Sequence, residues 1–464
     1  MKKERKEKGK GVRIFRGGLR FSKPDFKKTG RQLLELRKSH RLIFGTVIGL
    51  SICLAASILL PYIPVPYTLH LGLFSTSNWN VPESGTYAVV DQVIREFEKS
   101  HPYVRVEYTS GIVRDDYSEW LSDQIVQGIQ PDVFMVLDQD FNMLASLGAL
   151  LDLDSYIRND EMVSPESFYQ PAVEEGTYNH QVFALPYQCN LKLMFVNKKI
   201  LEEQNIEIPD WDWTTSEFSE ICRQVSHDFD QDGTYDQWGV SGYSWNDAAQ
   251  AFGLNLFDEN GESASVNQDG VRQAVQFMQE TGKYDQSRQQ SGLSDGFDSG
   301  LTAFAPMSLA EYKTYGPYPW KVRRYSTFDW TSLPMPSSPD SDASCSLDTL
   351  MMGISSTTRH RQASWELLRI FTADPGIQEM MMDQTSGMSA MRQLIAQKDD
   401  QEDDLSWKML DYALSHTRSK KRFRKYEDAM SLLNNGISEI LRSSSDLDLE
   451  LLELQKQLNT FLRE

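Results

Sequence analysis

Residues 132–137 read DVFMVL, a short and nearly continuous apolar run that is typical of a parallel strand buried on both faces. Towards the N-terminus, residues 117–127 have helical character, residues 104–108 (VRVEY) alternate like a strand, and residues 86–100 place apolar side chains at helical spacing. Residues 67–74 (YTLHLGLF) read as a further strand. This alternation of strands and helices predicts an open α/β sheet.

The same pattern resumes in the second half of the chain. Strand-like runs lie at residues 183–185, 191–196, 303–307 and 350–354, and helical spacing marks residues 365–371, 377–383 and 446–462. A prior of about 150 residues per domain suggests two or three domains for 464 residues.

Charge is distributed unevenly along the chain. Residues 1–41 carry 16 Lys or Arg and four acidic residues, whereas the rest carries 31 basic and 62 acidic residues. A body this acidic repels phosphate backbones, so we expect no nucleic-acid partner. The four cysteines have no C-x-x-C spacing, which excludes a zinc finger and a cystine-rich scaffold.

Residues 42–60 form an uncharged apolar run of 19 residues. As a helix the run would rise about 28 Å, close to the ~30 Å hydrocarbon core of a bilayer. Because the basic arm precedes it and the next basic residue is Arg95, the positive-inside rule predicts a single-pass anchor with a cytoplasmic N-terminus. The alternative is a cleaved signal peptide. Residues 61–66 contain three prolines and predict a stiff stalk before an extracellular body.

Several strings in this order resemble the extracellular solute-binding proteins of bacterial ABC importers, in particular the sugar-binding group (family 1). The matching strings are PDVF at 131–134, GALLDL at 148–153, ALPY at 184–187, LMFVNKK at 193–199 and WTTSEF at 213–218. The resemblance covers about residues 67–464.

The resemblance implies two hinged α/β lobes of the periplasmic-binding-protein type, with a carbohydrate held between them. The first lobe would comprise residues 67–185 plus 353–400 and the second residues 188–350 plus 401–464, with hinge strands crossing near 185–188 and 350–355. It also implies delivery of the carbohydrate to ABC transporter permease subunits. The predicted membrane anchor leaves open a sensing role beside a membrane kinase.

A sugar site needs flat aromatic rings for the apolar ring face and polar groups for the hydroxyls. Trp79 lies in a polar loop after the first strand, and Asp138 follows the strand at 132–137, where it could instead cap a helix. By the resemblance, Tyr187 faces the cleft from the first hinge. The remaining candidate ligand residues lie near predicted strand ends or in an aromatic loop: Trp245, Asn246, Glu311 and Trp320.

Residues 228–239 (DFDQDGTYDQWG) approximate a calcium loop. The expected ligands at positions 1, 3, 5, 7 and 9 are Asp228, Asp230, Asp232, the Thr234 carbonyl and Asp236. Gly239 stands where the loop normally has Glu, so a structural Ca²⁺ is expected to bind weakly, and a solvated acidic turn is the alternative.

Enzyme signatures are weak in this sequence. Gly292 to Gly296 (GLSDG) matches the nucleophile elbow of serine hydrolases formally, but no strand-like run precedes it. An extracytoplasmic glycosidase is a third hypothesis, although an abundance of acidic residues alone does not identify a catalytic pair. We therefore expect a binding protein and no catalytic residues.

Overall fold

The computed structural model describes residues 51, 65–160, 162–289, 297–313, 328–341, 345–398, 405–443 and 445–464. The basic arm, most of the predicted anchor and stalk, and Trp320 lie outside the described residues. Among the helices of the described part, none combines the length and the apolar character needed to cross a bilayer. The chain separates into the units Met1–Val65 and Pro66–Glu464, and the second unit is the body considered below.

The strands expected near the start of the body form a parallel group. β1 (Tyr67–Gly72) pairs in parallel with β2 (Val104–Tyr108) on one side and with β3 (Val133–Val136) on the other. β10 (Leu347–Ile354) then pairs antiparallel with β3. All four residues of β3 are buried, as its continuous apolar run predicts.

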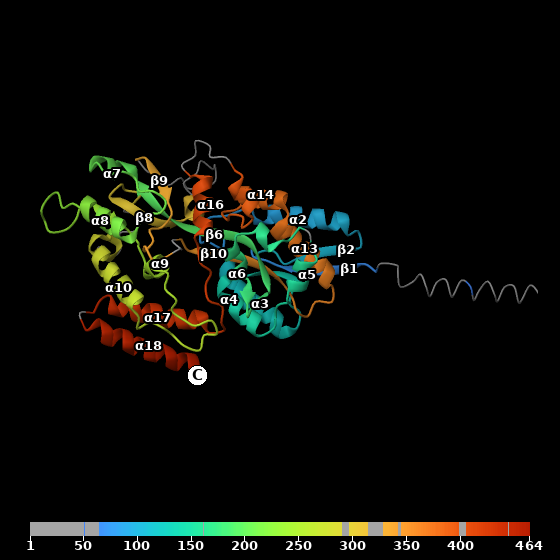
Figure 1. Cartoon of the computed structure of the whole chain (residues 1–464). Helices are drawn as coiled ribbons and strands as arrows, with labels where there is room; N and C mark the ends of the chain where they lie inside the picture. Colours follow the sequence, from blue (N-terminus) through green and yellow to red (C-terminus); the bar gives the residue numbers. More distant parts are fainter. Residues whose placement is uncertain are drawn as a thin grey trace, which may run out of the picture. The chain divides into compact units, whose positions relative to one another are not determined.

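We call this sheet with its flanking helices lobe one, which lies on the right of the body in Figure 1. Helix α2 buries Val89, Val93 and Phe97 against the sheet, which matches its helical spacing of apolar residues. The helices of lobe one are α2 (Thr86–Ser100), α3 (Arg114–Gln127), α4 (Asp138–Ser146), α5 (Asp154–Arg158), α6 (Gln170–Glu175), α13 (Arg361–Ala373) and α14 (Pro375–Gln384), with the short helix η2 (Pro165–Ser167) and the hairpin β4 (Thr177–Tyr178) and β5 (Gln181–Val182).

β6 (Ala184–Asn197) is a 14-residue strand that belongs to both halves of the body. Its residues up to Leu191 pair with β10, and its residues from Lys192 onward pair with β8 (Thr302–Ser308). The change of partner therefore falls a few residues after the crossing expected at 185–188. The sheet order is β2-β1-β3-β10-β6-β8-β7, with β9 also paired to β6.

Lobe two comprises the second half of β6 with β7 (Trp238–Val240), β8 and β9 (Trp330–Leu333), and lies on the left in Figure 1. Its helices are α7 (Lys198–Glu203), α8 (Thr215–Val225), α9 (Trp245–Ala251), α10 (Asp269–Thr281), η3 (Gly282–Tyr284), α11 (Gln286–Gln289) and α12 (Leu309–Tyr312). The two-lobed α/β fold expected from the sequence is thus present.

The C-terminal part of the chain returns to both lobes. It contains α15 (Arg392–Ala396), α16 (Trp407–Ser415), α17 (Tyr426–Ile440) and α18 (Leu447–Arg463). The amide of Ala264 donates to Asn459 Oδ1 at 2.7 Å and that of Asn267 to Gln455 Oε1 at 2.9 Å, which fixes α18 to lobe two. The link before α17 touches lobe one instead, because the Lys420 amide donates to Glu175 Oε1 at 2.8 Å.

Phe218 of α8 lies at the centre of the core of lobe two. Its ring is fully buried and packs edge-on against Trp213 and Phe304 at centroid distances of 5.7 and 5.5 Å. The helix that carries it begins with a capping box between Thr214 and Glu217, which satisfies amides that would otherwise lack partners.

Replacing Phe218 with Ala should lower the free energy of unfolding by about 3–5 kcal/mol, because the cavity left behind adds to the lost apolar burial. Urea unfolding followed by circular dichroism measures this. Phe229→Ala is the matched control, since that ring is 67% exposed and its loss should change stability by less than about 0.5 kcal/mol. Equal effects of the two substitutions would contradict the described core.

Candidate functional site

A polar cleft of about 550 Å³ lies between the lobes, where strands of both lobes end. The end of β1 leads into the loop that carries Trp79, and β3 leads into Asp138. β8 leads into Glu311 from the opposite side. Ligands of open α/β folds bind where the carboxyl ends of strands meet. The lining residues are Asn78, Trp79, Asn80, Arg114, Asp138, Gln139, Asn190, Lys192, Ser308, Glu311, Asp348, Thr349 and Glu427.

The loop after β1 holds Trp79 in a defined position. The Trp79 amide donates to Ser77 Oγ at 3.1 Å, and Ser77 is hydrogen-bonded to Ser386 at 2.9 Å. The indole is partly buried, and its Nε1–H is buried with no acceptor among the described residues. A buried N–H without an acceptor costs about 1–3 kcal/mol.

Asp138 forms the centre of an ion-pair cluster on the floor of the cleft. Its Oδ2 accepts from Lys420 Nζ at 2.6 Å and its Oδ1 from Arg422 Nη2 at 2.6 Å. Lys420 also donates to Asp348 Oδ1 at 2.8 Å, and Arg422 pairs with the fully buried Glu175. The carboxylate makes no helix-capping hydrogen bond, although Asp138 is the first residue of α4.

These pairs fix the ionisation of the cluster. Burial alone would raise the pKa of the Asp138 carboxyl, but the charges and hydrogen bonds of Lys420 and Arg422 outweigh burial and lower that pKa to about 2. Burial would lower the pKa of Lys420, but Asp348 and Asp138 hold it well above its usual range. Asp138 and Lys420 are therefore both charged at neutral pH, and each lies against an opposite charge of the protein.

The wall contributed by lobe two is equally constrained. Lys192, the first residue of β6 beyond the crossing, pairs with the buried Asp247 at 2.7 Å. Asn190 lies in the half of β6 that pairs with β10, and its Oδ1 accepts from the Ala310 amide of α12 at 3.0 Å, which orients its amide group. The Ser308 amide donates to Glu311 Oε2 at 2.8 Å in a capping box that starts α12.

The structure brings three of the predicted ligand residues together in the cleft, namely Trp79, Asp138 and Glu311. It places Tyr187 in the core instead of the cleft wall, fully buried and edge-on against Phe371 at 5.7 Å. The reason is that Tyr187 lies in the part of β6 that is covered by helix α13.

Trp245 and Asn246 do not line the cleft either. Ser244 and Asp247 form a capping box that starts α9 at Trp245, which turns the indole into the core with 7% exposure and leaves Asn246 exposed.

Several lining residues were not predicted from the sequence. These residues are Arg114, Gln139, Asn190, Lys192, Asp348 and Glu427, and none belongs to a local motif. Asn78 and Asn80 alone could be recognised from the sequence. They flank Trp79, and a Trp between two Asn in a loop is unusual.

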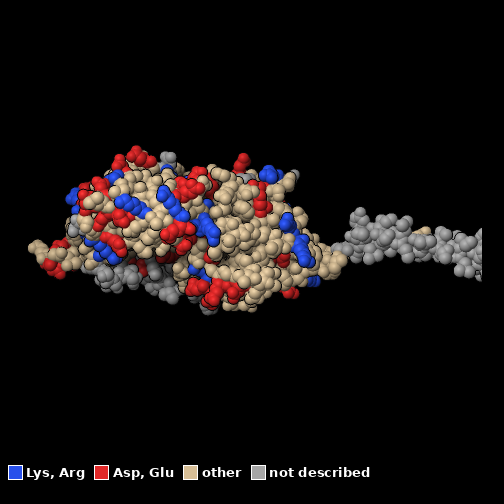
Figure 2. All heavy atoms as spheres, turned by 90° about the horizontal axis from the view of Figure 1, so that it is seen from below, with Lys and Arg blue, Asp and Glu red and all other residues tan. Residues whose placement is uncertain are grey.

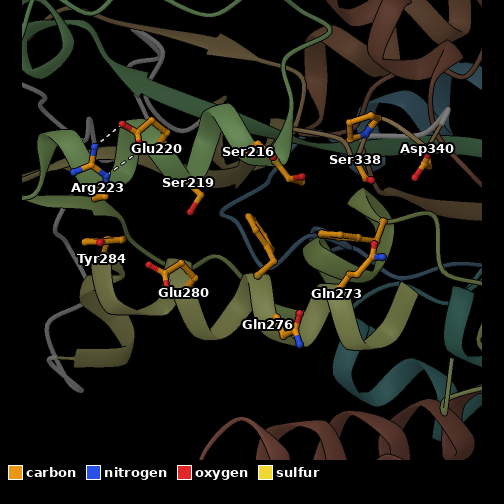
Figure 3. Close-up of a pocket in the computed structure, with 14 residues that line it drawn as sticks. Ser216, Ser219, Glu220, Arg223, Gln273, Gln276, Glu280, Tyr284, Ser338 and Asp340 are labelled. Carbon is orange, nitrogen blue, oxygen red and sulfur yellow. Dashed lines mark hydrogen bonds and ion pairs between the residues drawn. The ribbon is translucent and has the colours of Figure 1, made fainter. Parts of the chain in front are cut away.

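A second hollow, of about 650 Å³, lies between α8 and α10 on lobe two. Figure 3 shows Ser219 and Glu280 on facing helices, with the Glu220–Arg223 ion pair at one end and Asp340 at the other. All its lining residues belong to lobe two, and none is a predicted ligand residue. Lobe closure cannot enclose a ligand there, so the interlobe cleft is the better candidate despite its smaller volume.

The acidic loop after α8 gathers three carboxylates. Oxygens of Asp228, Asp230 and Asp236 lie within 4.8 Å of one another. The Asp232 amide hydrogen bond lowers the pKa of Asp230, but slight burial and the charges of Asp232, Asp236 and Asp228 outweigh it, so this pKa is raised. The carboxylates also accept backbone amides, as Asp228 Oδ1 does from Gln231 at 2.7 Å. Oxygen donors in this number suit Ca²⁺.

Two α/β lobes that share a crossing strand and enclose a polar cleft define a hinged binding protein. The chain belongs to the bacterial extracellular solute-binding protein family, whose model matches residues 80–377. The maltotriose-binding protein of Pyrococcus abyssi is 20% identical over 384 residues, which cover 80% of this chain and 78% of that protein.

Solved structures with the same fold include sugar-binding proteins. MalE from Xanthomonas citri matches with a TM-score of 0.70 and 16% identity, over 86% of this chain and 98% of that one. An ABC substrate-binding protein from Listeria monocytogenes, solved with cycloalternan, matches with a TM-score of 0.66 and 18% identity, over 86% and 99%. At such identities these likenesses establish the fold alone.

Replacing Asp138 with Asn should lower the free energy of unfolding at pH 5 by about 3 kcal/mol, because buried Arg422 loses one of its two carboxylates. Since folding lowers the pKa of Asp138, its stabilisation is complete above about pH 4 and is lost as the pH falls towards 2. The effect of the substitution should therefore shrink on acidification. Urea unfolding at pH 5 and pH 3 measures both effects.

Asp348→Asn is the matched control, because Asp348 also forms an ion pair with Lys420 but its side chain is 56% exposed. Its loss should cost less than about 1 kcal/mol. An Asp138→Asn protein as stable as the wild type would show that the cluster does not stabilise the fold.

Proposed function

We propose that the body is an extracellular receptor that binds an oligosaccharide between its lobes without turning it over. The observation that carries the proposal is the cleft itself: an indole with an unpartnered N–H beside a rim of amides and hydroxyls from Asn78, Gln139, Asn190 and Ser308. A sugar offers an apolar ring face to the indole and hydroxyls to the rim. The relatives named for maltotriose and other sugars support the same ligand class.

The same proposal extends to delivery and anchoring. An extracellular solute-binding protein presents its ligand to the permease subunits of an ABC transporter, and the apolar run at 42–60 would keep this one at the membrane with the body outside the cell. A receptor role beside a sensor kinase would use the same cleft. Neighbouring genes for a permease or for a kinase distinguish these two uses.

The direct test is a thermal-shift panel of soluble oligosaccharides with the full-length protein, followed by calorimetry on each hit. A ligand that binds only the folded state raises the melting temperature by mass action. At least one oligosaccharide should bind, and chromatography should recover it unchanged. Cleaved sugar would identify a glycosidase instead, and a panel without any binder would overturn the proposal.

Trp79→Ala should weaken oligosaccharide binding by about 1–3 kcal/mol while leaving the melting temperature of the free protein nearly unchanged. The partly buried ring is available to a ligand, whereas a purely structural Trp would cost ~3–5 kcal/mol of stability when truncated. Isothermal titration calorimetry and differential scanning calorimetry of the variant measure the two quantities.

Trp211→Ala serves as the control, because that indole is 38% exposed and does not line the cleft. Its truncation should leave the affinity unchanged. Either an untouched affinity or a collapse of stability in Trp79→Ala would remove Trp79 from the site.

We also propose that the acidic loop binds a structural Ca²⁺, with Asp228, Asp230 and Asp236 as its carboxylate ligands and with Asp232 and the Thr234 carbonyl as further candidates. The carboxylates that raise the pKa of Asp230 repel one another, and a cation relieves that repulsion. Extracellular modules bind calcium with Kd on the order of 10⁻⁴–10⁻³ M, so a loop without the final Glu is adequate there.

Chelation should lower the melting temperature of the wild type, and added Ca²⁺ should restore it, because the ion binds the folded loop. The double variant Asp230→Asn and Asp236→Asn should show no response. Glu259→Gln, an exposed acidic residue outside the loop, should respond like the wild type. A wild-type melting curve that ignores both chelator and Ca²⁺ rejects the ion.

A further inference from the structure

The link between α16 and α17 runs along the boundary between the two lobes (Figure 1). We call residues 418–423 of this link the strap. The strap contains neither helix nor strand, so its place in the body depends on the contacts that it makes with its surroundings. Those contacts divide between the two lobes.

Three strap residues contact lobe one. The Ser419 hydroxyl donates to a carboxylate of α6 at 2.6 Å, and the Lys420 amide donates to Glu175 Oε1 at 2.8 Å. The side chains of Lys420 and Arg422 both form ion pairs with Asp138 at 2.6 Å, and Arg422 also pairs with Glu175. The side of the strap that faces lobe one is therefore held mainly by charge.

The other three strap residues contact lobe two, in the segment that follows α9. Arg418 Nη1 donates to a backbone carbonyl there at 2.9 Å, and Lys421 Nζ lies 3.9 Å from a carboxylate oxygen of Glu259. The Phe423 ring is 4% exposed and packs edge-on against Phe257 at a centroid distance of 5.5 Å. The side of the strap that faces lobe two is therefore held mainly by a buried ring.

The pocket that holds the Phe423 ring is closely packed. Gly261 lies against the ring, and a Cβ at that position would come within 2.2 Å of it. Tyr426, at the start of α17, packs edge-on against the same ring at 5.4 Å. Since close-packed groups move little without breaking contacts, the ring has little room to slide when the lobes rotate.

Opening the hinge about β6 would pull the two sets of contacts apart. The Arg422 side chain is 5% exposed and that of Glu175 is fully buried, so their separation would leave buried charges without partners, which is strongly destabilising. Exposed charges, such as those that lie interleaved over the face shown in Figure 2, would resist separation far less.

We propose that the strap limits how far the hinge opens, so that the cleft of the unliganded body stays close to the width described here. This inference goes beyond the proposed sugar-binding function, because it concerns the free protein and holds for any ligand. Two lobes joined only by crossing strands could swing widely. The strap adds a restraint beside the cleft, and a ligand can shift the remaining range only by its preference for one width.

The test measures the distance between the lobes by double electron–electron resonance on the full-length protein without ligand. Spin labels go on Val126→Cys in α3 and Glu203→Cys in α7, which are 86% and 54% exposed and do not line the cleft. Cys53→Ser removes the cysteine outside the described residues, and the other three are buried. With the strap intact, the labels should give one narrow distance distribution.

Phe423→Ala releases the strap from lobe two and should add a second population at longer distance. Phe218→Ala is the matched control, because it also removes a buried ring from lobe two but leaves the strap contacts in place. It should lower stability and keep the single distance. The proposal is overturned if the protein with an intact strap already shows a broad range of distances, or if Phe423→Ala matches it.

A milder variant decides the question should Phe423→Ala fail to fold. Arg418→Gln with Lys421→Glu removes both polar contacts to lobe two and sets like charges opposite Glu259, without hollowing the core. It should show the same longer population in a smaller fraction of molecules. Arg424→Glu, the same reversal of charge at an exposed neighbour of the strap, should keep the single distance. Identical distributions in these two variants would overturn the restraint.

Discussion

The shared strand β6 is the constraint on which the rest of the body depends. One half of the strand is hydrogen-bonded to β10 in lobe one and the other half to β8 and β9 in lobe two, so the sheets of both lobes include the same strand. The strands of both lobes therefore end at one place, the cleft. Since the backbone is paired on both sides of the crossing, the lobes can rotate about it but cannot separate.

Beside this crossing, a cluster of ion pairs allows charged side chains to be partly buried at the cleft. Asp138, Lys420, Arg422 and Glu175 compensate one another, and the link between α16 and α17 supplies both cations. Removing one charged residue from such a cluster destabilises the fold by more than the whole cluster stabilises it. The cluster therefore holds the link in position. Because the link touches lobe one and α17 follows it on the opposite wall, the cluster also positions Glu427 at the cleft.

Local pattern predicts much of the fold and less of the site. The apolar run of β3 and the helical spacing of α2 are sufficient by themselves to identify the first sheet and the helix that covers it. Asp138 could be placed at the cleft because carboxyl ends of neighbouring parallel strands meet. The partners of Asp138 could not be placed at the cleft from the sequence. Lys420 and Arg422 follow more than 280 residues later and look like a solvated basic run.

Tyr187 and Trp245 mark the limit of such patterns. Both are aromatic residues near strand ends, and the sequence does not show that α13 covers Tyr187 or that a capping box turns Trp245 inward. The spacing of Ser244 and Asp247 indicates a helix that starts at Trp245. It also favours burial of the Trp245 side chain. Charged wall residues such as Lys192 and Glu427 give no local sign, because their position depends on the crossing and on the C-terminal return.

Amide hydrogen exchange of the full-length protein, with and without a saturating oligosaccharide, tests most directly whether both lobes hold the ligand at once. We expect slower exchange in two sets of segments on opposite walls: the loop after β1 and the start of α4 in lobe one, and α12 and the start of α17 across the cleft. Protection confined to one lobe, or centred on the hollow between α8 and α10, would contradict it.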